Sequence, residues 1–526
     1  MKSPSSLRRL QRRDRDGADD LGAVFAFGRR AADSRKVRET DRRGPPARPA
    51  LGALGVLLFV AALAPSVRPT AILGDFNAFY CAGRALAQGA DPYRAEPLGR
   101  CERTARPAPL KVSQPGLAMP APLPPYALAP FRVLAPLPYI AAAVIWIFLS
   151  ALAVGAAVVA MRRLTGLPWV ALVAAFALGD GYATLCLGQV APVAIGAIAL
   201  TAMFLADDRD ELAACAAGLA MIEPHVGFPV CLSLFIWRPR ARLGLAAIAV
   251  LCAVLSVTVA GAAVSIEYVR AVIPAHALSE IANEKQFSLS YLLHRFGVAD
   301  GPALRAGELW YGVMLLAGIF AAERVRRRGA GNAALALIPP ALAVFGGPFV
   351  HISQIAVAVP AALLLYARVA AMRHAIGVAL VALAIPWVQF ANLGTIFLGL
   401  AALAAAVLVA SFVDARPSRI AAGACAAAAF VAIAIALVQP IPDVQRLLVA
   451  AYDPAALAEA SWQRYVIAIG TANATAFDLA KLPTIAALMT LVSVVLRAAF
   501  RTMETRHVTF LASGEKGAVV PRRIAH

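Results

Sequence analysis

The residues best suited to chemistry lie together in one polar stretch, Gly74-Asp-Phe-Asn-Ala-Phe-Tyr80, which is followed by Arg84 and Asp91-Pro-Tyr93. Asp75 comes soon after an apolar run, so we expect it near the outer interface of a membrane. Ionisable groups at membrane depth are costly and therefore mark candidate sites. A second interpretation stays open, because Asp is also a preferred helix N-cap.

The local pattern around Asp75 predicts how it is presented. The residues after it are typical of a helix, which would place Asp75 and Phe79 on one face. Asp91-Pro-Tyr93 has the composition of a turn. The sequence shows no metal-binding cluster, and we expect neither a metal nor a cofactor.

The composition decides what kind of fold must carry these residues. Hydrophobic residues make up 60% of the chain and charged residues 15%, and the mean hydropathy is +0.72. A soluble domain carries about 25% charged residues. The apolar runs are rich in Ala, Leu and Val without period-2 alternation, and they approach the roughly 20 residues that a membrane helix needs. The sequence therefore predicts an all-α integral membrane protein, a polytopic helical bundle.

The net charge of +19 does not indicate a nucleic-acid partner. The basic residues concentrate in the N-terminal tail and in short loops between apolar runs. This is the positive-inside pattern, which sets topology. We expect the lipid bilayer of the plasma membrane as the partner, with both termini cytoplasmic.

About twelve spans satisfy this charge bias. We expect a basic tail at 1–50, a transmembrane domain at 51–500, and a cytoplasmic tail at 501–526. External loops are expected at 66–138, 264–305 and 439–481. The spans are expected near residues 51–65, 139–160, 168–186, 190–206, 243–263, 306–322, 332–349, 351–369, 374–391, 394–413, 419–438 and 482–500.

Residues 212–237 do not fit a single crossing. Glu223-Pro-His225 interrupts the apolar run, and a single crossing would move the basic segment 238–242 outside. Two half-helices that enter the membrane and return keep it inside. Non-helical backbone at that depth is tolerated where it lines a cavity. We therefore expect a re-entrant helical hairpin that faces a polar site.

Cys81 and Cys101 share the first expected external loop. A disulfide between them is compatible with an oxidising compartment, and the sequence leaves it undecided. The other cysteines show no metal-ligand spacing.

Several short motifs, in order, resemble glycosyltransferase family 87, the C-type membrane enzymes that use polyprenyl-phosphate sugars. The resemblance covers roughly residues 50–400 and rests on the order of the motifs. The motifs are Asp75-Phe-x-x-Phe-Tyr80, Ala85-Leu-x-x-Gly89-x-Asp-Pro-Tyr93, Pro-Leu-Pro-Pro-Tyr126, Leu187-Gly-Gln189, Ala217-Gly218-Leu219 before Pro224, Gln286-Phe-Ser288-Leu289 and Pro348-Phe-Val-His351.

The resemblance implies an inverting hexosyltransferase that moves a sugar, usually mannose, from a polyprenyl phosphate to a cell-envelope glycolipid or glycan on the external face. Asp75 would be the general base for the acceptor hydroxyl. His351 would pair with it, orienting it or sharing its proton. Where the family often has Lys before the hairpin proline, this chain has Glu223. Either another residue binds the phosphate or that role is lost.

The same resemblance assigns provisional roles to further polar residues. Cationic groups would hold the phosphate, although long basic side chains also extend to an interface without such a role. Tyrosines and glutamines would contact the substrate, although interfacial aromatic residues also anchor helices. The phosphate candidates are Arg84, Lys285, His294 and Arg295. The other candidate substrate contacts are Tyr80, Tyr93, Tyr126, Gln189 and Gln286.

Two other classes stay open: a transporter or flippase for a lipid-linked sugar, and a membrane polymerase or ligase of polysaccharide. Transporters often contain matching broken helices in both halves. The sequence shows one broken segment, 212–237, and no partner in the second half. The donor sugar, the acceptor and the linkage are not determined by the sequence.

Overall fold

The computed structural model describes residues 54–55, 57–58, 73–106, 117–176, 187–393, 395–412 and 453–500. These residues are predominantly helical. No strand occurs among them, and their one isolated bridge joins Arg94 and Leu457. The expected all-helical fold is therefore confirmed over these residues, and its apolar helices are consistent with a membrane protein. The expected tails 1–50 and 501–526, the span 419–438 and nearly all of the span 51–65 lie outside the described residues.

Within the described residues, four helices are long and apolar enough to cross a membrane, or five if a bent pair counts as one span. The expected number of about twelve is therefore not confirmed. The bent pair comprises Ile352–Arg368 and Ala370–Ala384, whose axes meet at 113°. The four helices are α6 (Tyr139–Thr165), α12 (Arg242–Ala260) with the short turn before it, α16 (Asp300–Val325) with the turn after it, and the second half of α24 (Ala458–Phe500).

Shorter helices occupy several of the other expected spans. α17 ends at Ala343 rather than near residue 349, and it contains Pro339 and Pro340. Proline cannot donate a backbone hydrogen bond, which favours short or distorted helices. These helices are α7 (Trp169–Phe176), α9 (Ala191–Ala206), α17 (Ala334–Ala343), α18 (Ile352–Ile355), α19 (Ala358–Arg368), α20 (Arg373–Ala384), α21 (Trp387–Leu393) and α22 (Thr395–Phe412).

Among their described residues, the segments expected as external loops contain several helices, of which the sequence predicted only the one after Asp75. α24 begins at Ala458, inside the expected loop 439–481. A search for long apolar runs detects only helices that cross lipid, so it misses short helices that pack on their ends. The helices in the first two loops are α3 (Gly74–Ala87), α4 (Ala95–Ala105), α5 (Pro125–Leu134), α13 (Ala262–Glu267), α14 (Ile273–Glu280) and α15 (Leu289–Arg295).

Basic residues that follow the apolar helices gather at one end of the bundle. Arg163, at the end of α6, lies 3.0 Å from Asp207 at the end of α9. Asn332, which follows α16, donates to the carbonyl of Leu205 in α9 at 3.2 Å. The ends of α6, α9 and α16 therefore lie close together.

The segment 210–237 forms a helical hairpin. It consists of α10 (Asp210–Ala220) and α11 (Pro224–Trp237). Arg238, just after α11, lies 2.6 Å from Asp210 and 3.0 Å from Asp208 at the start of α10, so the chain returns to the end where it began. The break lies at Glu223 (φ −120°, ψ 88°), because the residue before a proline avoids the helical region.

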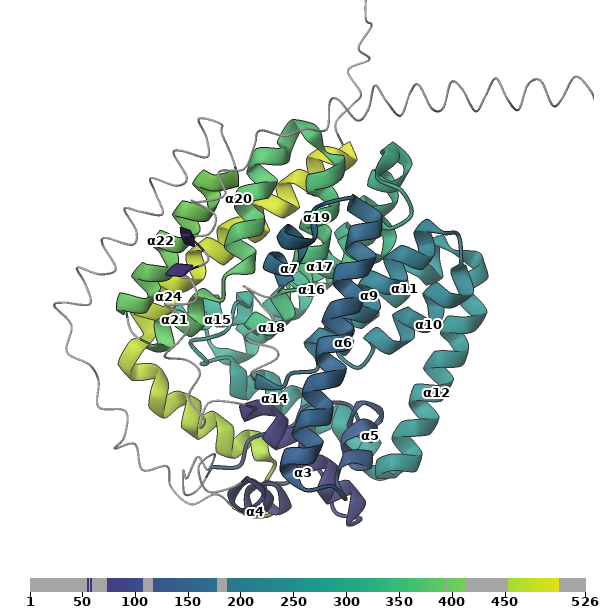
Figure 1. Cartoon of the computed structure of the whole chain (residues 1–526). Helices are drawn as coiled ribbons and strands as arrows, with labels where there is room; N and C mark the ends of the chain where they lie inside the picture. Colours follow the sequence, from purple (N-terminus) through teal and green to yellow (C-terminus); the bar gives the residue numbers. More distant parts are fainter. Residues whose placement is uncertain are drawn as a thin grey trace, which may run out of the picture.

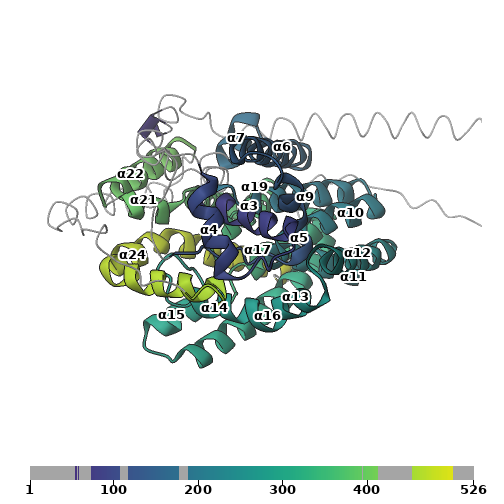
Figure 2. The same ribbon diagram turned by 90° about the horizontal axis from the view of Figure 1, so that it is seen from below.

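α3, α4 and α5 lie together at the other end, the lower end in Figure 1. Seen from below, α3 and α4 lie across the middle of this end, with α6, α12, α16 and α24 around them (Figure 2). A disulfide between Cys81 and Cys101 joins α3 to α4, which settles the question left open by the sequence. The expected turn also forms, since Tyr93 N–H donates to Asp91 Oδ1 at 2.9 Å.

The arrangement of the two ends predicts the membrane topology. Reporter fusions at residues 240 and 326 should read cytoplasmic, and fusions at 100, 285 and 455 should read external, because the basic connections lie at the end opposite α3. An external reading at 240 would contradict a hairpin that re-enters from the cytoplasmic side.

Candidate active site

Asp75 lies in the first turn of α3, and it is not the N-cap. The N-cap is Leu73, which adopts a left-handed conformation (φ 61°). The Asp75 carboxylate instead accepts a hydrogen bond from the side-chain amide of Gln189. Its burial raises the pKa of Asp75, and the Gln189 hydrogen bond opposes that rise. The N-cap interpretation is therefore wrong, because the carboxylate is bound by a side chain from another part of the chain.

Gln189 is positioned by a tight turn at Gly188. This glycine has φ +74°, and a Cβ on it would lie 2.5 Å from Cβ of Phe76. Its carbonyl accepts a hydrogen bond from Trp146 Nε1 at 2.8 Å. Only glycine allows both the left-handed backbone and this close approach. The Leu187-Gly-Gln189 motif therefore brings the amide to Asp75.

Asp75 and Gln189 form part of the wall of a cavity of about 760 Å³, a size typical of ligand sites. The wall combines α3, the hairpin tip, α14, residues 348–354 and α24. Among the described wall residues, Lys285 is the only lysine or arginine, and three are histidines. The carboxylates on the wall are Asp75, Glu223, Glu280, Glu284 and Glu308.

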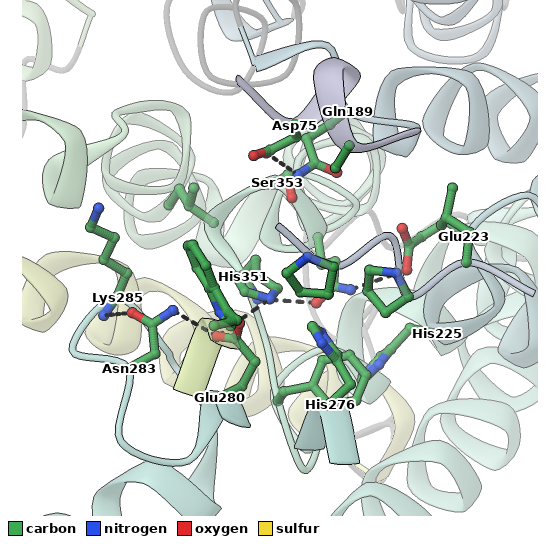
Figure 3. Close-up of a pocket in the computed structure, with 18 of the residues that line it drawn as sticks. Asp75, Gln189, Glu223, His225, His276, Glu280, Asn283, Lys285, His351 and Ser353 are labelled. Atoms are coloured by element: carbon green, nitrogen blue, oxygen red, sulfur yellow. Dashed lines mark hydrogen bonds and ion pairs between the residues drawn. The ribbon is translucent and has the colours of Figure 1, made fainter. Parts of the chain in front are cut away.

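Glu280 is the centre of a second hydrogen-bonded group, across the cavity from Asp75 (Figure 3). It accepts from Asn283 and from Gln286, both at 2.6 Å, and from Trp462 Nε1 at 2.5 Å. The side-chain oxygen of Gln286 accepts from Val350 N–H at 2.5 Å. Gln286 itself does not line the cavity. It positions the Glu280 side chain and the backbone at Val350 rather than contacting a ligand.

His351 lies on the wall, and its Coulombic effect lowers the pKa of Asp75, but among the described residues no hydrogen bond or ion pair joins the two side chains. Its Nε2 lies 3.8 Å from Glu280, and Gln286 Nε2 lies 3.1 Å from its ring nitrogens. Its backbone N–H donates to the side chain of Gln354 at 3.0 Å, and Gln354 donates to Glu223 at 3.0 Å. The fold thus pairs His351 with a glutamate from α14, which the sequence interpretation had missed.

Lys285 is the one phosphate candidate that faces the cavity. It is partly buried, and it makes no ion pair with the described residues; its Nζ lies 6.0 Å from the ring of Phe477. Burial lowers the pKa of Lys285, and the carboxylates Glu284, Asp75 and Glu280 oppose that change. A cation without a close counter-ion is suited to an anionic ligand.

The other expected cations lie elsewhere. Arg84 does not line the cavity. His294 lies 2.9 Å from Asp300, and Arg295 lies 3.2 Å from Asp478. Both are held by carboxylates away from the wall, so sequence proximity to Lys285 does not place them in the site.

The three candidate tyrosines brace the frame of the cavity. Each donates its hydroxyl proton to a backbone carbonyl, and none lines the wall. Direct substrate contact by these tyrosines is therefore not supported. The bonds are from Tyr80 to Leu137 at 2.8 Å, from Tyr93 to Leu123 at 2.7 Å and from Tyr126 to Met221 at 2.9 Å.

The polar wall residues missing from the sequence-based candidates include His225, His276, Glu280 and Trp462. His276 and Glu280 stand four residues apart in α14, so they share a face of that helix. The four-residue spacing could have indicated that the two side chains face the same way. It was not used because the segment was interpreted as a loop rather than a helix. No signal pointed to Trp462, which arrives from the other end of the chain.

Fold and site together define a helical membrane protein with a charged, partly enclosed cavity at one end of its bundle. Residues 123–345 match the model of glycosyltransferase family 87. The match covers less than half of the chain, and it supports the resemblance to this glycosyltransferase family that the motifs show. No curated protein and no solved structure matches the chain.

The matched segment contains much of the cavity wall, including Gln189, the hairpin tip, Glu280 and Lys285. Asp75 lies well before this segment, and His351 lies shortly after its end. The structure joins them to the matched segment through the Gln189 and Gln286 hydrogen bonds. Their roles therefore rest on geometry and on the motif resemblance, and not on the family match.

The Gly188 turn gives a test of how Gln189 is positioned. Gly188→Ala should destabilise the protein by more than the about 1–2 kcal/mol of a left-handed alanine, because Phe76 must also move, and it should impair any activity that needs Asp75. Gly166→Ala is the matched control, with φ +71° and nothing near its Cβ position. Thermal unfolding in detergent compares the two. Equal losses in both variants would contradict the packing argument.

Proposed function

We propose that this protein is a membrane glycosyltransferase that moves a hexose, in the first instance mannose, from a polyprenyl phosphate to a hydroxyl of a cell-envelope glycolipid or glycan on the external face. One observation carries the proposal: an Asp75 carboxylate and a Lys285 ammonium without a close counter-ion share the wall of one cavity. A base for the acceptor and a cation for the departing phosphate are the two groups that this reaction needs.

The reaction follows from these two groups. The acceptor oxygen attacks the anomeric carbon from the face opposite the phosphate, and the bond from that carbon to the phosphate oxygen breaks. Asp75 accepts the hydroxyl proton as general base. The bond electrons leave on the polyprenyl phosphate, which needs no proton because phosphate is a good leaving group. Attack from the opposite face inverts the anomeric configuration.

Lys285 would bind the phosphate as its negative charge grows. Charge-assisted hydrogen bonds to phosphate are the strong ones, and a cation fixed in a cavity stabilises developing charge without reorganising. Burial lowers the pKa of Lys285, and the neighbouring carboxylates Glu284, Asp75 and Glu280 oppose that lowering. They also repel an anionic donor, so the position of this cation matters for donor binding.

A transporter or flippase of a lipid-linked sugar is the second candidate, and one observation favours it. The structure contains a second break, at residues 344–351 between α17 and α18, which the sequence did not reveal. This break lies against the α10–α11 hairpin, since a Cβ on Gly347 would lie 2.7 Å from Nε2 of His225. Two broken segments at one site are typical of transporters, but the family match favours transfer. Polymerase or ligase chemistry remains the third alternative.

The first functional test replaces the base. Asp75→Asn should keep expression and donor binding and reduce transfer about 10²–10⁴-fold, the usual contribution of a general base. Transfer is measured in proteoliposomes with labelled polyprenyl-phosphate mannose and an envelope lipid extract. Asp91→Asn, in the turn outside the cavity, is the matched control and should stay near wild type. Transfer by Asp75→Asn within a few-fold of wild type would contradict the assignment.

The second test removes the cation. Lys285→Met should raise the donor KM about ten- to hundred-fold, the value of a hydrogen bond to a charged group, and change the acceptor KM little. Arg295→Met removes a nearby cation that is already paired with Asp478 and should leave the donor KM unchanged. If donor sugar crosses the vesicle membrane without being transferred, the protein is a flippase and both assignments fail.

A further inference from the structure

We propose that His276, Glu280 and His351 form a binding site for one divalent transition-metal ion on the cavity wall. Each side chain offers one ligand atom, and the three atoms lie within 4.8 Å of one another. His276 is 4% exposed and Glu280 is 2% exposed. Figure 3 shows the three side chains together on the side of the cavity away from Asp75.

The fold explains why these three residues meet. His276 and Glu280 are separated by one helical turn in α14, so both side chains project from one face. His351 comes from the break before α18, where it is the N-cap. The rings of His276 and His351 are 6.3 Å apart between centroids. Two ligands from one helix turn and a third from a distant segment is a common way to build a metal site.

An unpartnered atom points to a missing ligand. Nδ1 of His276 is buried and has no hydrogen-bond partner. Leaving a buried polar atom unpaired costs about 1–3 kcal/mol, so such an atom needs an explanation. An ion pair between His351 and Glu280 would account for those two residues, but it leaves His276 unexplained. A shared metal ion would engage all three residues, with His276 bound through one of its ring nitrogens.

The surroundings of Glu280 also fit a metal ligand. Asn283, Gln286 and Trp462 all donate hydrogen bonds to its carboxylate. Ligand carboxylates in metal sites are held in this way by outer partners, which fix their orientation. None of the three donors is a cation, so the negative charge of Glu280 remains available to an ion.

The ligand set selects the class of metal. Two imidazoles and one carboxylate bind Zn²⁺, Mn²⁺ or Fe²⁺ and leave at least one position open. With bonds of about 2.0–2.1 Å, bound ligand atoms would lie about 3.4 Å apart, so binding would draw the three side chains together. If the proposed function holds, an open position toward the cavity would be available to a donor phosphate oxygen, beside Lys285.

The test measures metal binding without any donor, so it does not depend on the proposed function. Full-length protein carrying no histidine tag is purified in detergent, treated with chelator and titrated with Co²⁺. Visible absorption and calorimetry report the binding, and Zn²⁺ should displace the cobalt. We expect one ion per chain. His276→Ala, Glu280→Gln and His351→Ala should each weaken binding at least about tenfold.

His294→Ala is the matched control, because His294 is paired with Asp300 outside the cavity, and it should bind as wild type does. Size-exclusion profiles and thermal unfolding identify any variant that fails to fold, and the folded variants decide the result. Absence of one-to-one binding, or binding unaffected in every folded variant of the three residues, would overturn the proposal. Metal binding without sugar transfer would leave the metal site standing and remove only the proposed function.

Discussion

The site depends on one recurring interaction, a hydrogen bond from a glutamine amide to a cavity carboxylate. Gln189 holds Asp75, Gln286 holds Glu280 and Gln354 holds Glu223. In the first and third pairs the two residues come from distant parts of the chain, whereas Gln286 and Glu280 are six residues apart. A glutamine amide donates a hydrogen bond that fixes the position of a carboxylate, but it does not neutralise the negative charge. An arginine would fix the position and also neutralise the charge. The cavity can therefore keep negative groups in fixed positions and still leave their charge available.

The carboxylates of this cavity would repel an anionic ligand. Several carboxylates line the wall, against one lysine among the described residues. A lipid-linked phosphate entering such a site needs a positive charge at the position where it binds, because the attraction between fixed charges rises steeply as the local dielectric falls. Lys285 supplies one charge. A metal ion held by Glu280 and two histidines would supply more, and it would turn a carboxylate that repels phosphate into part of a site that attracts it.

Two breaks in the helices create the space for these groups. The hairpin tip at Glu223 and the segment 344–351 both carry prolines and both end at the cavity, and Gln354 joins them through Glu223. Irregular backbone has unpaired polar groups, which are tolerated in a membrane bundle only where protein or water surrounds them. The polar cavity therefore accommodates the unpaired backbone groups of the two breaks, and the breaks in turn make room for the polar side chains.

The sequence by itself determined the class of fold, because apolar run length and the placement of basic residues are local properties governed by the membrane. It also identified Asp75, Gln189, Lys285 and the hairpin break, whose residue types are costly in an apolar chain. It could not decide which residues would face one another. His351 meets Glu280 rather than Asp75, Arg295 is held by Asp478, and Trp462 reaches the cavity from a segment interpreted as a loop. Those outcomes depend on contacts between segments far apart in the chain, and only the packing of the helices fixes them.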